Sequence, residues 1–436
     1  MLSRFFWIIA AFVAICGPGP VTGQSHFMLR EGDRVVFYGD SITAQRLYSR
    51  FTEDIIVSRY PNLHLAFYNA GVSGDTVSGG HAGDMETRVK RDVVQWHPTV
   101  VTLMLGMNDG GYTADVNAHL REYSDGYRKL IATLRALLPG VRLILICPSP
   151  YDEVSRPSLI PGYGDVIRRY GQFVTSLGKE EGIPVIDLNT PMEDAIKQGM
   201  AIDPQMAGAL LPDRIHPSPA GHWVMAAALA EGLKIDPVVT SVTIHLPGGT
   251  ADESYRSAVI EIHAAQDGLT WTQLDQAVPL PLELNDPFVQ FLLRISDLGK
   301  IDRQILRVTG LASEHYTLYI DNGKIGTFTK GELAAGVNLA EVQTPMEQQA
   351  KSVDWTADDR AKLSGTRFDL LTQEPPVDQR IEGLGALDSL DERMITQEYE
   401  NARPKAHVFR PGTGDTVMKR FSPPSSINAQ GPDLRR

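Results

Sequence analysis

Short runs of branched apolar residues alternate with longer segments of helical periodicity through the first half of the chain. The apolar runs lie at residues 34–38, 63–68, 100–105, 143–147 and 184–188. Helical spacing is clearest over residues 114–138, 164–181 and 219–233. Runs that are apolar on both faces are typical of strands buried in a parallel sheet, because helices cover both sides of such a sheet. The pattern over residues 33–235 therefore predicts a doubly wound α/β domain.

The pattern changes after about residue 235. Four later segments alternate apolar and polar residues, at 238–246, 258–262, 305–308 and 316–320. Such alternation is typical of half-exposed antiparallel strands, and Asn322-Gly323 predicts a tight hairpin turn. We therefore expect a β-rich accessory module over residues 236–330.

The rest of the chain falls into two parts. Apolar residues recur at helical spacing from about residue 330, so residues 331–402 are predicted to be a helical extension. The sequence leaves open whether this extension packs against the first domain. Residues 403–436 are rich in Pro, Gly, Ser and basic side chains, which favours a disordered tail.

The N-terminal segment has the pattern of a secretory signal peptide over residues 1–23. Arg4 precedes an apolar run of about a dozen residues, a Gly-Pro-Gly-Pro breaker and small residues near Gly23. The run is shorter than the roughly 20 apolar residues that a membrane span needs, although an uncleaved anchor is the alternative. We expect a secreted or periplasmic protein with no membrane span after cleavage.

Length and charge narrow the choice of partners. The chain has 436 residues, more than one ordinary domain needs, and a formal net charge of -12. This acidic balance argues against nucleic acid or an anionic membrane as a partner. Signal removal also leaves Cys147 as the sole cysteine, and its place at the end of an apolar run predicts a buried, inert thiol.

Four short motifs follow the predicted strands and supply the candidate chemistry. They are Gly39-Asp40-Ser41, Asn69-Ala70-Gly71-Val72-Ser73-Gly74, Gly106-Met107-Asn108-Asp109 and Asp213-Arg214-Ile215-His216. The first three fall at the carboxyl ends of strands, where open α/β sheets form their ligand crevice. The sequence thus predicts that the motifs converge on one rim of the sheet.

The residue types in these motifs suit acyl transfer through serine. Ser41 is the candidate nucleophile, and His216 is the candidate base that takes its proton. Asp213, three residues earlier, is placed to orient and stabilise the imidazole. The backbone N–H groups of Ser41 and Gly74 and the side-chain amide of Asn108 are candidate oxyanion-hole donors.

Each of these residues also has a simpler interpretation. Gly74 and Asn108 are common in turns, and Asp213 with His216 would alone be read as a surface ion pair. Asp40 is expected to cap the helix after Ser41 or to brace the loop. His222 is the rival base, but it has no aspartate at close spacing before it and is expected to pack, or to bond to a loop, near the site. No Cys/His spacing suggests a metal, and the chemistry requires no cofactor.

The motifs resemble those of the SGNH/GDSL hydrolase family. Ser41 matches the family's nucleophile, Gly74 its block-two glycine, Asn108 its block-three asparagine, and Asp213 with His216 its final block. The resemblance implies a three-layer α/β/α flavodoxin-like fold for the hydrolase domain, which we assign to residues 24–235.

The sequence and the resemblance together lead to one functional hypothesis. We expect a secreted serine esterase that acts on small acyl esters through a Ser41 acyl-enzyme, with acetylated carbohydrate as the expected substrate. The substrate class follows from the resemblance and from secretion. The alternatives are an acyltransferase with a sugar acceptor, or a non-catalytic carbohydrate-binding protein on a hydrolase scaffold.

Overall fold

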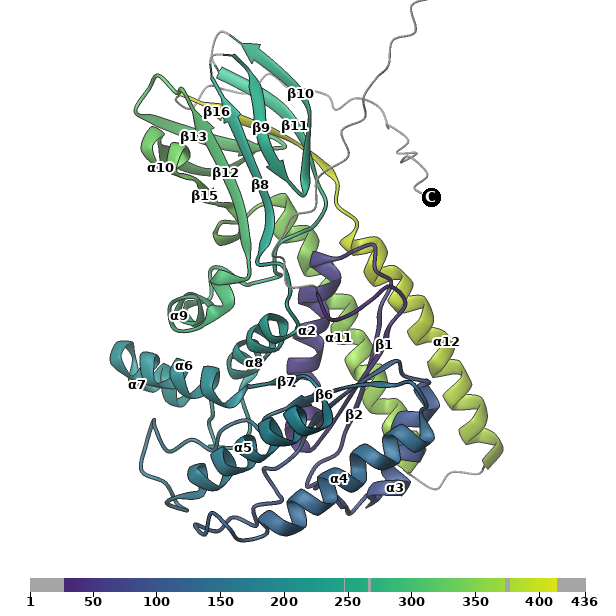
Figure 1. Cartoon of the computed structure of the whole chain (residues 1–436). Coiled ribbons are helices and arrows are strands. Elements are labelled where there is room, and N and C mark those ends of the chain that lie inside the picture. The colour runs from purple at the N-terminus through teal and green to yellow at the C-terminus, as the bar shows by residue number, and fades with distance from the viewer. Residues whose placement is uncertain (1–26, 247, 266–267, 373–376, 414–436) are drawn as a thin grey trace, which may run out of the picture.

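The computed structural model describes residues 27–246, 248–265, 268–372 and 377–413, and Figure 1 shows how their helices and strands are arranged. Their buried apolar side chains form two hydrophobic cores. The predicted signal peptide lies outside the described residues. Among the helices of the described part, none is long and apolar enough to cross a membrane.

The first core surrounds a five-stranded parallel sheet in the order β2-β1-β5-β6-β7. Its strands are β1 (Arg34–Gly39), β2 (Ala66–Gly71), β5 (Val100–Met104), β6 (Arg142–Ile146) and β7 (Val185–Ile186). Their apolar side chains are buried on both faces, as the continuous apolar runs predict. The doubly wound α/β fold is thereby confirmed.

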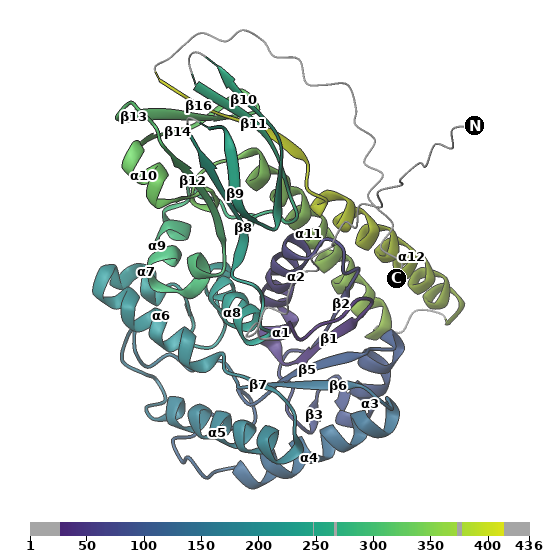
Figure 2. The same cartoon turned by 45° about the horizontal axis from the view of Figure 1, so that its top comes forward.

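Helices cover both faces of this sheet, and two views agree on their sides (Figures 1 and 2). One face carries α3 (Met85–Arg88), α4 (Leu120–Leu137) and α5 (Tyr163–Glu181). The other carries α2 (Leu47–Arg59) and α8 (Pro219–Gly232), which pack on each other. Helices α6 (Asn189–Ile202) and α7 (Pro204–Gly208) precede α8, and β3 (Gly79–Gly80) and β4 (Gly83–Asp84) form a small hairpin.

The second core lies between two further sheets. The five-stranded sheet has the order β10-β11-β16-β13-β14, and the four-stranded sheet has the order β15-β12-β8-β9. The strands are β8 (Val238–His245), β9 (Thr250–Tyr255), β10 (Ser257–Ala265), β11 (Gly268–Asp275), β12 (Arg303–Thr309), β13 (His315–Ile320), β14 (Gly323–Thr329), β15 (Val337–Asn338) and β16 (Ala406–Gly412). The alternation of apolar and polar residues predicts antiparallel pairing, but β8 and β12 pair in parallel. The chain leaves these sheets after β11 and re-enters them at β12 from the end at which β8 begins.

The hairpin turn between β13 and β14 differs from the predicted Asn322-Gly323 turn. Ile320 pairs with Gly323, so Asp321 and Asn322 form the turn, both with positive φ. The Asp321 carboxylate accepts the N–H of Val408 at 2.8 Å, which ties the turn to β16. Asp and Asn both tolerate this backbone conformation, and the bond to β16 selects this register.

The prediction of a disordered tail over residues 403–436 is wrong for its first part. Residues 406–412 form β16, which lies between β11 and β13 (Figure 1). Phe409 is 1% exposed and stacks on Trp271 with ring centroids 5.2 Å apart. Burial of this aromatic ring orders a segment whose composition favours disorder. Residues 414–436 lie outside the described residues.

The helical extension consists of α10 (Lys330–Ala335), which packs on β12 and β14, and the long helices α11 (Pro345–Thr372) and α12 (Val377–Ala402). The long helices form a hairpin that packs against α2 (Figure 1). Arg360 of α11 is buried and pairs with Glu53 of α2 and with Asp391 and Glu398 of α12. The long helices therefore join the first core.

The segments that form each core do not follow the predicted domain boundary at residue 330. Residues 280–301, which include α9 (Pro287–Ile295), contribute buried side chains to the first core. The second core instead draws on β8 to β15 and on β16. The chain thus leaves the C-terminal sheets twice and returns to them, which local periodicity does not reveal.

Candidate active site

The candidate nucleophile lies on a tight turn directly after β1. The short helix α1 (Ser41–Ala44) begins at Ser41, and Asp40 is its N-cap, with Oδ1 accepting the Ile42 N–H at 3.0 Å. This is the capping role expected from the sequence. Burial raises the pKa of Asp40 to about 7. A buried cap therefore fixes the backbone that presents Ser41.

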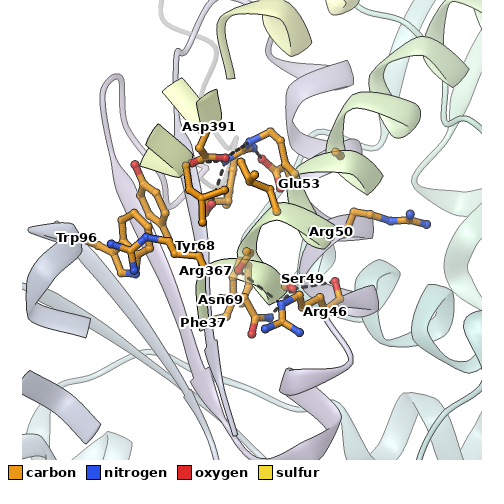
Figure 3. A pocket seen from close by; sticks show the side chains of 17 residues that line it. Phe37, Arg46, Ser49, Arg50, Glu53, Tyr68, Asn69, Trp96, Arg367 and Asp391 are labelled. Atoms are coloured by element: carbon orange, nitrogen blue, oxygen red, sulfur yellow. Dashed lines mark hydrogen bonds and ion pairs between the residues drawn. The ribbon is translucent and has the colours of Figure 1, made fainter. Parts of the chain in front are cut away.

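Two side chains hold this turn from behind, at the pocket drawn in Figure 3. Asn69 of β2 donates from Nδ2 to the Thr43 carbonyl at 2.8 Å and to Ser49 Oγ at 2.9 Å. Arg46 donates to the Ala44 carbonyl at 2.9 Å, and α11 covers it from the other side. The helical extension thus closes the back of the nucleophile turn.

The imidazole of His216 lies between the hydroxyl of Ser41 and the carboxylate of Asp213. Its Nε2 is 2.8 Å from Ser41 Oγ, and its Nδ1 is 2.7 Å from Asp213 Oδ2. An ionised carboxylate accepts from Nδ1–H, which leaves Nε2 free to accept the serine proton. The structure therefore brings the three predicted catalytic residues into one hydrogen-bonded chain.

The Asp213 carboxylate stays ionised in this position. Partial burial raises its pKa, but bonds from the His216 backbone N–H and ring and from the Ile215 N–H outweigh burial and lower the pKa below its usual value. Its Oδ1 accepts these backbone N–H groups at 2.7 and 2.9 Å. The carboxylate is therefore held in one orientation while it supports the imidazole.

Arg214 anchors the turn that carries Asp213 and His216, and sequence reasoning missed it. Its φ of 78° lies in the left-handed region, and its side chain is 7% exposed. The guanidinium donates to the carbonyls of Asp152 at 3.0 Å, Arg156 at 3.1 Å and Pro157. Arginine side chains are usually exposed, so nothing in the sequence indicates that Arg214 is buried.

The candidate oxyanion donors follow three neighbouring strands. Ser41 follows β1 directly, Gly74 comes shortly after β2, and Asn108 shortly after β5, and β1 lies between the other two strands. Gly74 has a φ of 75°, which explains the choice of glycine. A Cβ there would come no closer than 3.8 Å to another residue, so conformation rather than crowding is the requirement.

The Asn108 amide is fixed by bonds at both of its ends. Its Nδ2 donates one hydrogen to the Asp75 carbonyl at 2.9 Å, and its Oδ1 accepts the Tyr112 hydroxyl at 3.0 Å. An amide nitrogen carries two hydrogens, so one remains for a substrate. Tyr112, with a φ of 53° and its ring stacked on Tyr163, is a second residue that sequence reasoning missed.

Two other reactive side chains are held away from chemistry. His222 is buried, and its Nδ1 accepts the Tyr48 N–H at 3.2 Å while Nε2 faces Gln45 Oε1. Burial lowers the pKa of His222 to about 3, so the ring stays neutral. Cys147 is buried against α5, where its Sγ contacts the Gly171 carbonyl, and burial raises the pKa of its thiol to about 11. Within the described residues, no group of three or more His, Cys, Asp or Glu is placed to hold a metal ion.

Known proteins resemble the first domain in sequence and the larger part of the chain in fold. Residues 37–224 match the GDSL-like lipase/acylhydrolase family. An acetylxylan esterase of Geobacillus stearothermophilus is 28% identical over 222 residues, which are 45% of this chain and 92% of that protein. A GDSL esterase/lipase of Arabidopsis thaliana is 25% identical over 215 residues, 44% of this chain and 81% of that protein.

A solved structure shares the fold beyond the first domain. The structure of a gut microbial diltiazem-metabolizing enzyme matches with a TM-score of 0.75 at 23% identity, over 89% of this chain and 99% of that chain. The site geometry and these matches define the class of the protein, a carboxylic ester hydrolase. Its first domain belongs to the SGNH/GDSL hydrolase family.

Proposed function

We propose that the chain is a secreted serine esterase that removes small acyl groups, acetyl foremost, from polysaccharide. One observation carries the mechanism: the His216 imidazole lies within hydrogen-bond distance of both Ser41 Oγ and Asp213. A serine hydroxyl becomes nucleophilic when such a base accepts its proton.

The first half-reaction forms the acyl-enzyme. Ser41 Oγ attacks the ester carbonyl while Nε2 of His216 takes the hydroxyl proton, and Asp213 stabilises the imidazolium. The tetrahedral intermediate collapses, the C–O bond to the alcohol breaks, and His216 returns the proton to the leaving oxygen. Water then attacks the acyl carbonyl by the same route and releases the acid and free Ser41.

Charge on the intermediate's oxygen calls for donors that are already oriented. The backbone N–H groups of Ser41 and Gly74 and the remaining Nδ2 hydrogen of Asn108 are assigned to this role. The bonds from Asn108 to Asp75 and Tyr112 support the assignment, because they hold the amide in place before substrate binds. Donors that need no reorganisation contribute most to catalysis.

Two observations support the substrate class. The relative from Geobacillus stearothermophilus, which this chain matches over 92% of its length, is an acetylxylan esterase. The N-terminal pattern of a secretory signal suits an enzyme that meets polysaccharide outside the cytoplasm. Acetyl esters on a xylan backbone are therefore the first substrates to test.

The test is a chain-length series of p-nitrophenyl esters, run beside acetylated xylan with release of acetate as the readout. We expect acetate to be the best acyl group and the polysaccharide to be deacetylated. The Ser41→Ala variant should lose about 10⁶-fold in turnover, as nucleophile removal does in serine hydrolases. Ser176→Ala, which alters an exposed hydroxyl on α5, should leave turnover unchanged.

Two results would overturn the proposal. Near-normal turnover by Ser41→Ala would remove this residue from its role. A preference for long acyl chains with no action on acetylated xylan would contradict the substrate class. Adding free xylo-oligosaccharide as acceptor separates hydrolysis from transfer, because an acyltransferase would form acylated sugar in place of free acetate.

A further inference from the structure

A groove opens beside the first turn of α8, next to the candidate active site. Helices α2, α8, α9 and α11, together with the chain before α9, line it. Pro219 lines the groove and is three residues after His216, so their Cα atoms are at most about 11 Å apart. The groove is thus built jointly by the esterase domain and by the C-terminal part of the chain.

Aromatic side chains form one part of the groove. Trp355 of α11 is 65% exposed, although a large indole ring is usually buried. Trp223 of α8 stacks on Phe51 with ring centroids 4.1 Å apart and is half-buried. A flat, exposed ring beside a second aromatic suits a ligand with a flat apolar face.

Charged side chains form the other part, and they are already paired. Lys351 donates to Glu283 at 3.0 Å, and Arg50 lies 3.4 Å from Asp354. The Glu283 side chain is 69% exposed, so its carboxylate has acceptor capacity left for a ligand. Both cations of the groove are held in ion pairs, and the three carboxylates Glu283, Asp286 and Asp354 outnumber them. The groove therefore disfavours an anionic ligand and suits a neutral one that both donates and accepts hydrogen bonds.

The size of the groove limits the ligand further. Its free volume is about 210 Å³, below the roughly 300–1,000 Å³ of pockets that enclose a drug-sized molecule. An opening of this size accommodates one ring of an extended ligand rather than a whole molecule. A saccharide ring meets all these conditions, since it has an apolar C–H face and a rim of neutral hydroxyls.

We propose that this groove is a saccharide subsite, in which Trp355 stacks on a sugar ring and the Glu283–Lys351 pair bonds its hydroxyl groups. The inference rests on the proposed function, because the ring belongs to the polysaccharide whose ester is cleaved at Ser41. The subsite binds substrate and transition state equally, so it acts on KM and leaves kcat unchanged. It also gives the helical extension a direct part in substrate selection.

Trp355→Ala tests the subsite, with Ile381→Ala as the matched control. Ile381 lies on α12, outside the groove, and is 64% exposed, so both variants remove an exposed apolar side chain. For acetylated xylo-oligosaccharides, we expect Trp355→Ala to raise KM about 10-fold with kcat retained, and Trp355→Phe to restore part of the loss. Hydrolysis of p-nitrophenyl acetate should be unchanged in all three variants.

A binding measurement separates this inference from the proposed function. Deacetylated xylo-oligosaccharide titrated into the Ser41→Ala protein should bind, and adding Trp355→Ala should weaken binding about 10-fold. If p-nitrophenyl acetate is cleaved but Trp355→Ala handles oligosaccharides like wild type, the subsite is wrong and the esterase stands. If wild type cleaves no ester at all, the proposed function fails first.

Discussion

The esterase domain and the C-terminal sheets are built from the chain in opposite ways. The central sheet takes its strands in near-sequential order, and its helices alternate with them. The C-terminal sheets are completed by β16, which pairs with strands far back along the chain. The bond between Val408 and Asp321, for example, spans 87 positions.

This difference separates the tasks of the two regions. In the esterase domain, loops after three neighbouring parallel strands place the candidate residues Ser41, Gly74 and Asn108 at one edge of the sheet, so local motifs carry the proposed chemistry. In the C-terminal region, long returns of the chain brace the first core through Arg360 and cover the nucleophile turn at Arg46. We therefore expect substitutions at the candidate active site to act on turnover, and substitutions inside the C-terminal sheets to act on stability.

Phe409→Ala should give the largest difference between an effect on stability and an effect on turnover. Removing a buried aromatic side chain costs about 3–5 kcal/mol of unfolding free energy. Calorimetry should show a lowered transition for the C-terminal sheets, while turnover of p-nitrophenyl acetate at 25 °C is retained. Val408→Ala on the same strand is the control, because Val408 is 40% exposed and should cost little. Equal losses of activity and stability would contradict the separation.

Asn108→Ala should show the converse behaviour in the esterase domain. Loss of one oxyanion donor lowers kcat about 10²–10³-fold, and the half-buried side chain contributes little to the core. Steady-state kinetics on p-nitrophenyl acetate, with the melting temperature measured in parallel, checks both parts. A loss of activity that follows unfolding would instead assign Asn108 to the turn alone.

Tyr112→Phe sharpens the same comparison with a smaller change. It removes the hydroxyl that donates to Asn108 Oδ1 and keeps the ring stacked on Tyr163. We expect kcat to fall about 3- to 10-fold with KM unchanged, since one hydrogen bond orients the amide. In the Asn108→Ala background the second substitution should have no further effect, and additive losses would exclude a positioning role for Tyr112.

Buried His222 in the esterase core should make the stability of the protein depend on pH. Its folded pKa of about 3 lies below the ordinary value of about 6.5, so the unfolded chain binds the extra proton. Stability from this group is present above pH 6.5 and is lost as the pH falls toward 3. Melting temperatures from pH 7 to 4 should fall less steeply for His222→Gln than for wild type. His263→Gln, which alters an exposed ring, should match wild type.

The features that could be predicted from the sequence are those encoded by residues close together along the chain. Buried parallel strands appear as continuous apolar runs, and the spacing from Asp213 to His216 brings both side chains to one turn. The position of Ser41 directly after β1 follows from the same pattern. These relations depend on residues a few positions apart, so a single sequence contains them.

The unpredicted part depends on contacts between distant residues. Arg214 is buried because backbone carbonyls within residues 152–157 accept its hydrogen bonds. Strand β16 is ordered because Phe409 stacks on Trp271. The turn at Asp321 and Asn322 is selected by its bond to Val408 rather than by the Asn-Gly pair. In each case a long-range partner overrides the local preference.

The central claim is that Ser41, activated by His216, is the residue that carries the acyl group. The most direct measurement is intact-mass and peptide analysis after reaction with a fluorophosphonate, which modifies activated serines covalently. We predict one adduct per chain on the peptide that contains Ser41, and its loss in the His216→Ala variant while Ser176 stays unmodified throughout. Undiminished labelling of the His216→Ala variant, or an adduct on another residue, would contradict the account.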